Sequence, residues 1–233
     1  MIINKKLVFL AFLIILLFIF KNKENFLINE EKWLNYRLGD CIKDGYNLRN
    51  RTLKNYPNSL GSKFVHKIRS LNLNIETNQD RLNVLNSIIK EEKKKYTLPN
   101  EKDVVLHLRL GDILSKYNKT DFSFTKENWG TDLNKLESIL QKIKEKHKVS
   151  KFYIVYGAHK KNINVNLNKK FLEKIKQLCK KYFTEVILRN TDPDSDFIFM
   201  CSSKIFIKSG GGFSRYISNI VKMNNGIIYD CAK

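Results

Sequence analysis

The stretch Val104-Val105-Leu106-His107-Leu108-Arg109-Leu110-Gly111-Asp112 predicts the first strand of the fold and the turn that follows it. The segment from Val104 to Leu108 is apolar except for His107, as expected of a strand that is buried on both faces. This strand runs directly into Arg109, Gly111 and Asp112. Ligands of open parallel sheets bind beyond the carboxyl ends of the strands, so these residues fall where a ligand would sit. An ordinary surface turn, with Arg109 paired to Asp112, is the alternative.

From this strand to the C-terminus, strand and helix patterns alternate. We expect strands at 104–108, 151–157, 185–188, 204–208 and 226–229, and helices at 131–147, 167–183, 196–202 and 213–223. Such an alternation predicts an α/β fold in which residues 101–233 form a Rossmann-like domain with a parallel sheet and right-handed crossovers. The segment 113–130 has no clean period and is expected to be a long loop, of the kind that is usually functional or mobile.

The N-terminal residues 1–23 contain an uninterrupted apolar run from Leu7 to Phe20, with lysines on both sides. At about 1.5 Å per residue, this run of about 14 residues is shorter than a hydrocarbon core of about 30 Å, so a cleaved signal peptide competes with an anchor. The run lacks a small-residue cleavage site, which favours an uncleaved signal anchor. We therefore expect a single-pass membrane protein. The lysines on the two sides balance in the positive-inside count and leave both orientations open; we favour type II, with the remaining residues in the endoplasmic reticulum or Golgi lumen.

Residues 24–100 predict a mostly helical region, which we interpret as a reduced, acceptor-side part of the protein. A short helix is expected at 30–37, followed by a turn at Leu38-Gly39-Asp40. A longer helix should start near Ser59 and bury Leu60, Phe64, Ile68 and Leu71. Another is expected at 78–95.

The chain carries 43 Lys and Arg against 23 Asp and Glu, a formal net charge of +20. This excess would suit a nucleic acid, an anionic membrane or a phosphorylated substrate. The lysines are scattered along expected helix faces, and the sequence has no recognisable nucleic-acid-binding module, so nucleic acid is the disfavoured partner.

Cysteines and sequons bear on the compartment. Cys41, Cys179, Cys201 and Cys231 lack metal-site spacing, which argues against zinc. In an oxidising lumen one or two disulfides would be permitted, and the sequence does not pair them. The sequons at Asn50 and Asn118 also fit a luminal side.

A glycine-rich loop, Ser209-Gly210-Gly211-Gly212-Phe213-Ser214, lies between an expected strand and an expected helix. Glycines there allow backbone N–H groups to approach a ligand, and a helix N-terminus favours an anion. Arg109 follows one strand and this loop follows another, so the two would bind a pyrophosphate from two sides. The alternative is a flexible turn in which Ser214 caps the helix.

Two of these stretches resemble a known family. His107-Leu108-Arg109-Leu110-Gly111-Asp112 is similar to the H-x-R-R-G-D motif of the α-1,2- and α-1,6-fucosyltransferases and protein O-fucosyltransferases, which use GDP-fucose. Asp196 to Ser214 resembles their later motif, D-F-x-x-M followed by a strand and S-x-S-x-F-S. The resemblance covers roughly residue 104 to the C-terminus. It implies a GT-B-like fold and a glycosyltransferase that moves fucose with inversion, without a metal, to a glycan or protein hydroxyl.

The resemblance also implies roles for individual residues. Arg109 would bind the β-phosphate of GDP-fucose and stabilise the departing GDP. His107 would pack near the nucleotide, and Phe213 with Ser214 would line the phosphate and sugar. Either Asp194 or Asp196 would receive guanine N–H groups. Asp112 would orient the acceptor or Arg109; with Asp121 and Glu127 it is also a positional candidate for the general base.

Departures from the family pattern leave alternatives open. Leu110 stands where many members have a second Arg, so that charge is either missing or supplied elsewhere, by Lys208 or Arg215. One alternative is a degenerate, non-catalytic, membrane-anchored protein that binds nucleotides or glycans. Another uses the two D-x-D triplets in residues 192–196 to bind a metal in a metal-dependent glycosyltransferase. We favour instead a helix start there, capped by Asp194 or Ser195.

Overall fold

The computed structural model describes residues 36–43, 46–72, 77–118, 122, 130–157 and 164–232. These residues belong to one compact unit that begins at Asn35. The predicted anchor, residues 1–23, and the candidate bases Asp121 and Glu127 lie outside the described residues. Among the helices that are described, none combines the length and the apolar character needed to cross a bilayer. The anchor and the luminal location stay predictions.

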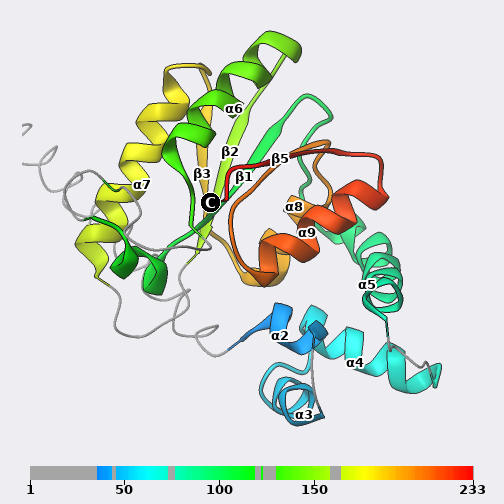
Figure 1. Cartoon of the computed structure of the whole chain (residues 1–233). Coiled ribbons are helices and arrows are strands. Elements are labelled where there is room, and N and C mark those ends of the chain that lie inside the picture. The colour runs from blue at the N-terminus through cyan, green and yellow to red at the C-terminus, as the bar shows by residue number, and fades with distance from the viewer. Residues whose placement is uncertain are drawn as a thin grey trace, which may run out of the picture. The chain divides into compact units, whose positions relative to one another are not determined.

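The expected parallel sheet is confirmed. It contains β1 (Val104–Arg109), β2 (Phe152–Gly157), β3 (Val186–Arg189), β4 (Ile205–Lys208) and β5 (Ile227–Asp230) (Figure 1). The strand order is β3-β2-β1-β4-β5, and every pairing is parallel. The chain therefore builds outward from β1 to β3 and then returns to add β4 on the other side of β1. This reversal of direction makes the carboxyl ends of β1 and β4 the switch point at which ligands of such sheets bind.

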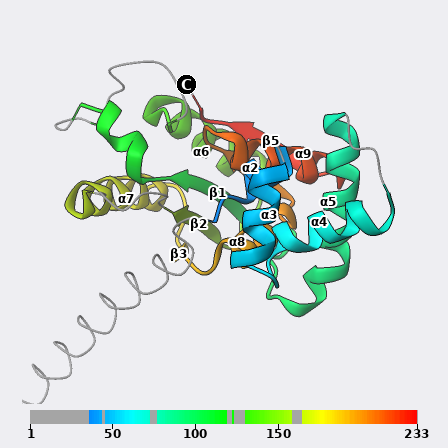
Figure 2. The same cartoon turned by 90° about the horizontal axis from the view of Figure 1, so that it is seen from below.

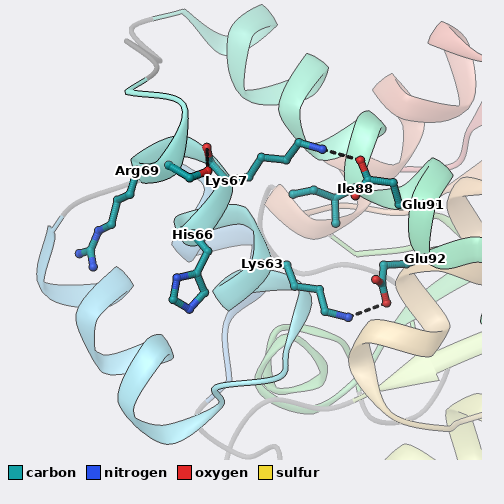
Figure 3. Close-up of a pocket in the computed structure, with 8 residues that line it drawn as sticks. Lys63, His66, Lys67, Arg69, Ile88, Glu91 and Glu92 are labelled. Carbon is teal, nitrogen blue, oxygen red and sulfur yellow. Dashed lines mark hydrogen bonds and ion pairs between the residues drawn. The ribbon is translucent and has the colours of Figure 1, made fainter.

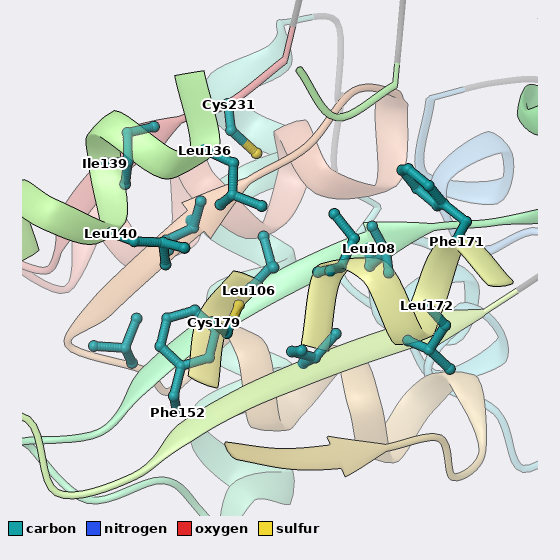
Figure 4. Packing of buried hydrophobic residues seen from close by; sticks show 14 of the residues in the cluster. Leu106, Leu108, Leu136, Ile139, Leu140, Phe152, Phe171, Leu172, Cys179 and Cys231 are labelled. Carbon is teal, nitrogen blue, oxygen red and sulfur yellow. The ribbon is translucent and has the colours of Figure 1, made fainter. Parts of the chain in front are cut away.

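Helices cover both faces of the sheet. α6 (Leu133–Lys146) and α7 (Val165–Lys180) lie on one face, and α8 (Pro193–Cys201) and α9 (Gly212–Met223) lie on the other (Figures 1 and 2). Alternate strand residues point to opposite faces. Leu106 and Leu108 accordingly pack with α6 and α7 in one buried cluster (Figure 4), whereas His107 contacts Phe213 of α9. Arg109 shares the parity of His107 and extends toward the α9 side.

Before the sheet, the described residues are helical, as expected. They form α2 (Leu38–Lys43), α3 (Tyr46–Asn55), α4 (Leu60–Ser70) and α5 (Asn78–Glu92), then a 3-10 turn, η1 (Lys93–Lys95). The side chain of Ser59 caps α4, and a capping box of Thr77 and Asp80 starts α5, so local chemistry sets both starts. α2 packs against α9 and α5 packs against α8 and α9, while α3 and α4 pack on the other N-terminal helices. All the described strands lie in the single C-terminal sheet, so the GT-B comparison stays a prediction for the N-terminal half.

Some local expectations in this region were wrong. Leu38-Gly39-Asp40 starts helix α2 and is not a turn, because Leu38 is buried and α2 packs onto α4 and α9. α3 was not expected at all. Leu71 is not part of the buried stripe of α4: it is the C-cap residue and is 56% exposed.

Two expectations in the C-terminal domain also need correction. α8 starts at Pro193, not Asp196, and its cap is Asp192, not Asp194 or Ser195. The Asp192 carboxylate accepts the backbone N–H groups of Asp194 and Ser195, and proline suits the first helical position. The expected loop begins with a 3-10 segment, η2 (Gly111–Lys116).

All four cysteines are buried free thiols, so the disulfides that a lumen would permit are not formed. The first sequon lies within α3, where the hydroxyl-bearing residue Thr52 is buried.

Candidate functional site

The two predicted anion-binding loops meet at the switch point. Gly211 has φ 100° and ψ 163°, a conformation that is essentially restricted to glycine. A Cβ atom at this position would lie 2.9 Å from Nη1 and 3.9 Å from Cζ of Arg109. The Arg109 guanidinium thus packs directly onto the backbone of the glycine loop. Residues 102 positions apart in sequence are brought together as the sequence pattern predicted.

A cavity of about 650 Å³ opens beside this loop. Its wall comes from α2, the start of α6, the ends of β4 and β5, and the first turn of α9. The lining residues are Asp40, Lys43, Lys135, Lys208, Ser209, Gly210, Gly211, Gly212, Arg215, Asp230 and Ala232. The volume is within the range of about 300–1,000 Å³ that is typical of small-ligand pockets.

The charges of the cavity favour an anion. Four cations from four different elements line it, against two carboxylates. The Nζ atom of Lys208 pairs with Asp230 at 2.7 Å, and that of Lys135 donates to the carbonyl of Ala232 at 2.9 Å. Lys43 and Arg215 have no ion pair within the described part of the chain. Together with the open N-terminus of α9, they offer charge and N–H donors to a phosphate group. Both cations that we considered as replacements for a second family arginine, Lys208 and Arg215, lie here.

Helix α2 forms one wall of the cavity, a role that the sequence analysis did not predict. A Cβ atom on Gly39 would lie 3.4 Å from the backbone nitrogen of Phe213, so α2 rests on the first turn of α9. This close approach brings Asp40 and Lys43 to the cavity wall. No charge motif marks α2 in the sequence, and the only signal was a glycine beside buried apolar residues.

Asp194, a predicted guanine ligand, is instead engaged by the N-terminal helices. Its Oδ1 accepts the Tyr36 hydroxyl at 2.6 Å and its Oδ2 accepts the Leu60 N–H at 2.7 Å. The Tyr36 hydroxyl in turn accepts the Gly61 N–H at 2.9 Å. Burial raises the pKa of Asp194 to about 6, although these hydrogen bonds oppose the shift. This network ties the N-terminus of α4 and Tyr36, two residues before α2, to α8.

Asp196 is also held by protein donors. It accepts the backbone N–H and the hydroxyl of Thr191, and it pairs with Arg189 Nε at 2.8 Å. Burial raises the pKa of Asp196. Neither Asp194 nor Asp196 lines the glycine-loop cavity. The D-x-D carboxylates are therefore divided among separate protein partners, and no three potential metal ligands cluster anywhere in the described ranges.

His107 supports the glycine loop from below. Its Nδ1 lies 3.1 Å from Ser209 Oγ, and its ring packs on Phe213 with centroids 5.5 Å apart. His107 is 7% exposed and Ser209 is 1% exposed. Ser214 is fully buried beneath the first turn of α9. His107, Ser209 and Ser214 thus support the buried side of the glycine loop. A Cβ atom on Gly212 would have no atom within 4 Å.

Asn168, on α7, holds the turn that carries Arg109 and was missed by sequence reasoning. Gly111 has φ 83°, and its N–H donates to Asn168 Oδ1 at 3.1 Å. The Leu110 N–H donates to the carbonyl of Gly157 at 3.0 Å. A single buried Asn among lysines gives no motif that would have revealed it. Asp112 belongs to η2, but its side chain lies outside the described part of the structure.

A second cavity, of about 610 Å³, lies between α4 and α5 (Figure 3). Two lysines of α4 reach across it to glutamates of α5: Lys63 pairs with Glu92 at 2.5 Å and Lys67 pairs with Glu91 at 2.6 Å. These pairs neutralise both lysines of the groove, and Arg69 donates to the Asn50 side chain. We therefore assign this groove to helix packing and keep the glycine-loop cavity as the candidate anion site.

Comparisons with known proteins do not place the chain in a family. No family model matches it, and no curated protein matches its sequence. Among solved structures, POFUT1 in complex with GDP gives a TM-score of 0.36 at 13% identity, covering 65% of this chain and 49% of the other. POFUT1 in complex with GDP-fucose gives 0.38 at 13% identity, covering 81% and 59%. The chain thus spans about half to three-fifths of these structures, and similarity at this level establishes no shared function.

Proposed function

We propose that this chain is a glycosyltransferase that takes a sugar from a nucleoside diphosphate sugar. The observation that carries the proposal is the contact between the Arg109 guanidinium and Gly211 at the switch point of the sheet, beside a cavity with excess positive charge. A diphosphate is the anion that such a site suits best, because a guanidinium, lysine amines and helix N–H groups converge on one loop.

The same groups would lower the barrier to transfer. When the bond between the sugar C1 atom and the diphosphate oxygen breaks, negative charge grows on the leaving nucleoside diphosphate. Arg109 is packed on the loop before the reaction, so it needs little reorganisation as that charge develops. Lys43 and Arg215 line the cavity and add positive charge. Removing one such preorganised group commonly costs about 100-fold to 1,000-fold in rate.

GDP-fucose is our first candidate donor, and the support for it is the resemblance of the two sequence motifs to the fucosyltransferases. Inversion and independence of metal follow from the same resemblance and are part of the proposal. A glycan or a protein hydroxyl would be the acceptor. The second candidate function is a non-catalytic nucleotide- or glycan-binding protein, which the enclosure of Asp194 and Asp196 by protein donors favours.

Thermal unfolding of the full-length chain tests the donor site. We would add GDP, GDP-fucose, GDP-mannose, UDP or ADP to the wild type, to Arg109→Ala and to Arg51→Ala. Arg51 is an exposed arginine of α3, so its loss removes the same charge away from the cavity. A ligand at about 100 times its dissociation constant should stabilise the fold by about 2.7 kcal/mol.

A rise in melting temperature that is selective for guanine nucleotides, absent in Arg109→Ala and kept in Arg51→Ala, would support the donor site. No rise with any nucleotide would refute it. A rise with GDP-fucose without release of GDP in a coupled assay would favour the non-catalytic binder.

A further inference from the structure

Transfer to a hydroxyl needs a group that receives the acceptor proton, and the cavity offers two carboxylates for this task. Asp40 belongs to α2 and Asp230 ends β5, and both line the cavity beside the glycine loop. In an inverting transfer the acceptor hydroxyl attacks C1 from the face opposite the leaving diphosphate, so a base on the cavity wall has to face the sugar rather than the phosphates.

The hydrogen bonds of the two carboxylates differ. In Asp230, Oδ2 pairs with Lys208 at 2.7 Å and Oδ1 accepts the Ala232 N–H at 3.0 Å, so both oxygens are used. In Asp40, Oδ2 pairs with Arg37 Nε at 3.1 Å, and Oδ1 has no protein donor among the residues that the structure describes. Asp40 is therefore the carboxylate with an oxygen available to a substrate.

The backbone of Asp40 is held in place, whereas its ion pair leaves the side chain free to move. The preceding residue, Gly39, packs on Phe213 at the start of α9, which fixes the backbone of Asp40 beside the glycine loop. The side chains of Arg37 and Asp40 are 57% and 45% exposed, and exposed pairs of this kind contribute about 0–1 kcal/mol. The carboxylate can thus turn toward a ligand at small cost.

We propose that Asp40 is the general base of the transfer reaction and that its Oδ1 receives the proton of the acceptor hydroxyl. This inference rests on the proposed function. As the acceptor oxygen bonds to the sugar C1 atom, the bond from C1 to the diphosphate oxygen breaks. The proton passes to Asp40, and the nucleoside diphosphate departs with its electron pair toward Arg109 and the loop. As an acidic residue in the first turn of α2, Asp40 also stabilises that helix through its negative charge. This structural role does not require a free Oδ1.

A comparison of two acceptors tests the role without knowledge of the natural one. Water must lose a proton when it attacks, whereas azide attacks as an anion and needs no base. We would measure GDP release from GDP-fucose by the full-length chain in water alone and with sodium azide, for wild type, Asp40→Asn and Asp230→Asn. Melting temperature with and without GDP would be recorded for each variant.

In Asp40→Asn, the hydrolysis rate should fall by about 100-fold or more, the usual range for loss of a general base. The azide rate and the stabilisation by GDP should stay within a few-fold of the wild type. Asp230→Asn removes the same charge from another part of the wall and should change both rates in the same proportion. Equal effects of Asp40→Asn on the two reactions, or none on either, would overturn the role of Asp40 alone. A wild-type chain that binds GDP but releases none from GDP-fucose would overturn both this role and the transferase proposal.

Discussion

The carboxylate of Asp194 should make the stability of this protein increase as the pH falls from 7 to 5. Burial raises its pKa in the folded chain to about 6, from an ordinary value of 3.8. Between these values the folded chain holds a proton that the unfolded chain has released, so stability is gained as pH falls through 6. One pKa unit corresponds to about 1.4 kcal/mol, which gives a limit of about 3 kcal/mol below the unfolded pKa and a gain of about 1.3 kcal/mol between pH 7 and pH 5.

Urea unfolding followed by circular dichroism at pH 7, 6 and 5 would measure this effect. Asp194→Asn keeps the shape of the side chain and an oxygen for the Leu60 N–H, but it cannot titrate. The gain of about 1.3 kcal/mol in the wild type should therefore disappear in this variant, while groups elsewhere contribute equally to both. Asp192→Asn makes the same chemical change two residues away and keeps a good helix cap, so it should follow the wild type. Parallel curves for the wild type and Asp194→Asn would refute the assigned pKa and its cause.

Two further substitutions test the backbone of the site. Gly211→Ala forces a side chain into a glycine conformation and against the Arg109 guanidinium; it should lose about 1–3 kcal/mol in urea unfolding and weaken stabilisation by GDP. In Gly212→Ala the new methyl group meets no protein atom within 4 Å, so this variant should keep the stability of the wild type. Asn168→Leu removes the acceptor of a turn N–H and should lose about 1–3 kcal/mol, against less than about 0.5 kcal/mol for the exposed Asn166→Leu. Wild-type stability in Gly211→Ala or Asn168→Leu would contradict these assignments.

The sheet was predictable from sequence because its signals are local. Each strand is a short apolar run, α6, α7 and α9 each have a buried stripe, and parallel pairing follows from the alternation of strands and helices. The failures lie where tertiary contacts override local signals. Leu38-Gly39-Asp40 has turn composition, yet it is helical because Leu38 is buried and Gly39 lies against the backbone of Phe213.

The site was predictable in part for the same reason. Arg109 and the glycine loop end two strands, and strand topology alone brings such ends together. The carboxylates could not be assigned in this way, because an Asp near a site has the same sequence signature whether it binds a ligand or a protein donor. Asp194 accepts from Tyr36, 158 positions away, and no local pattern reports such a partner.

The position of Asp194 also connects the N-terminal helices to ligand binding. Through Tyr36 and Leu60, this carboxylate holds the segment before α2 and the N-terminus of α4 on α8, and α2 supplies Asp40 and Lys43 to the cavity. A ligand that binds only the assembled cavity stabilises the docked arrangement of these helices. Docking of the helices strengthens ligand binding by the same free energy, because coupling between two equilibria is reciprocal. Asp194 therefore influences the anion site without lining it. One of the two residues predicted to bind the nucleotide base thus holds, in this structure, the helix that lines the proposed anion site.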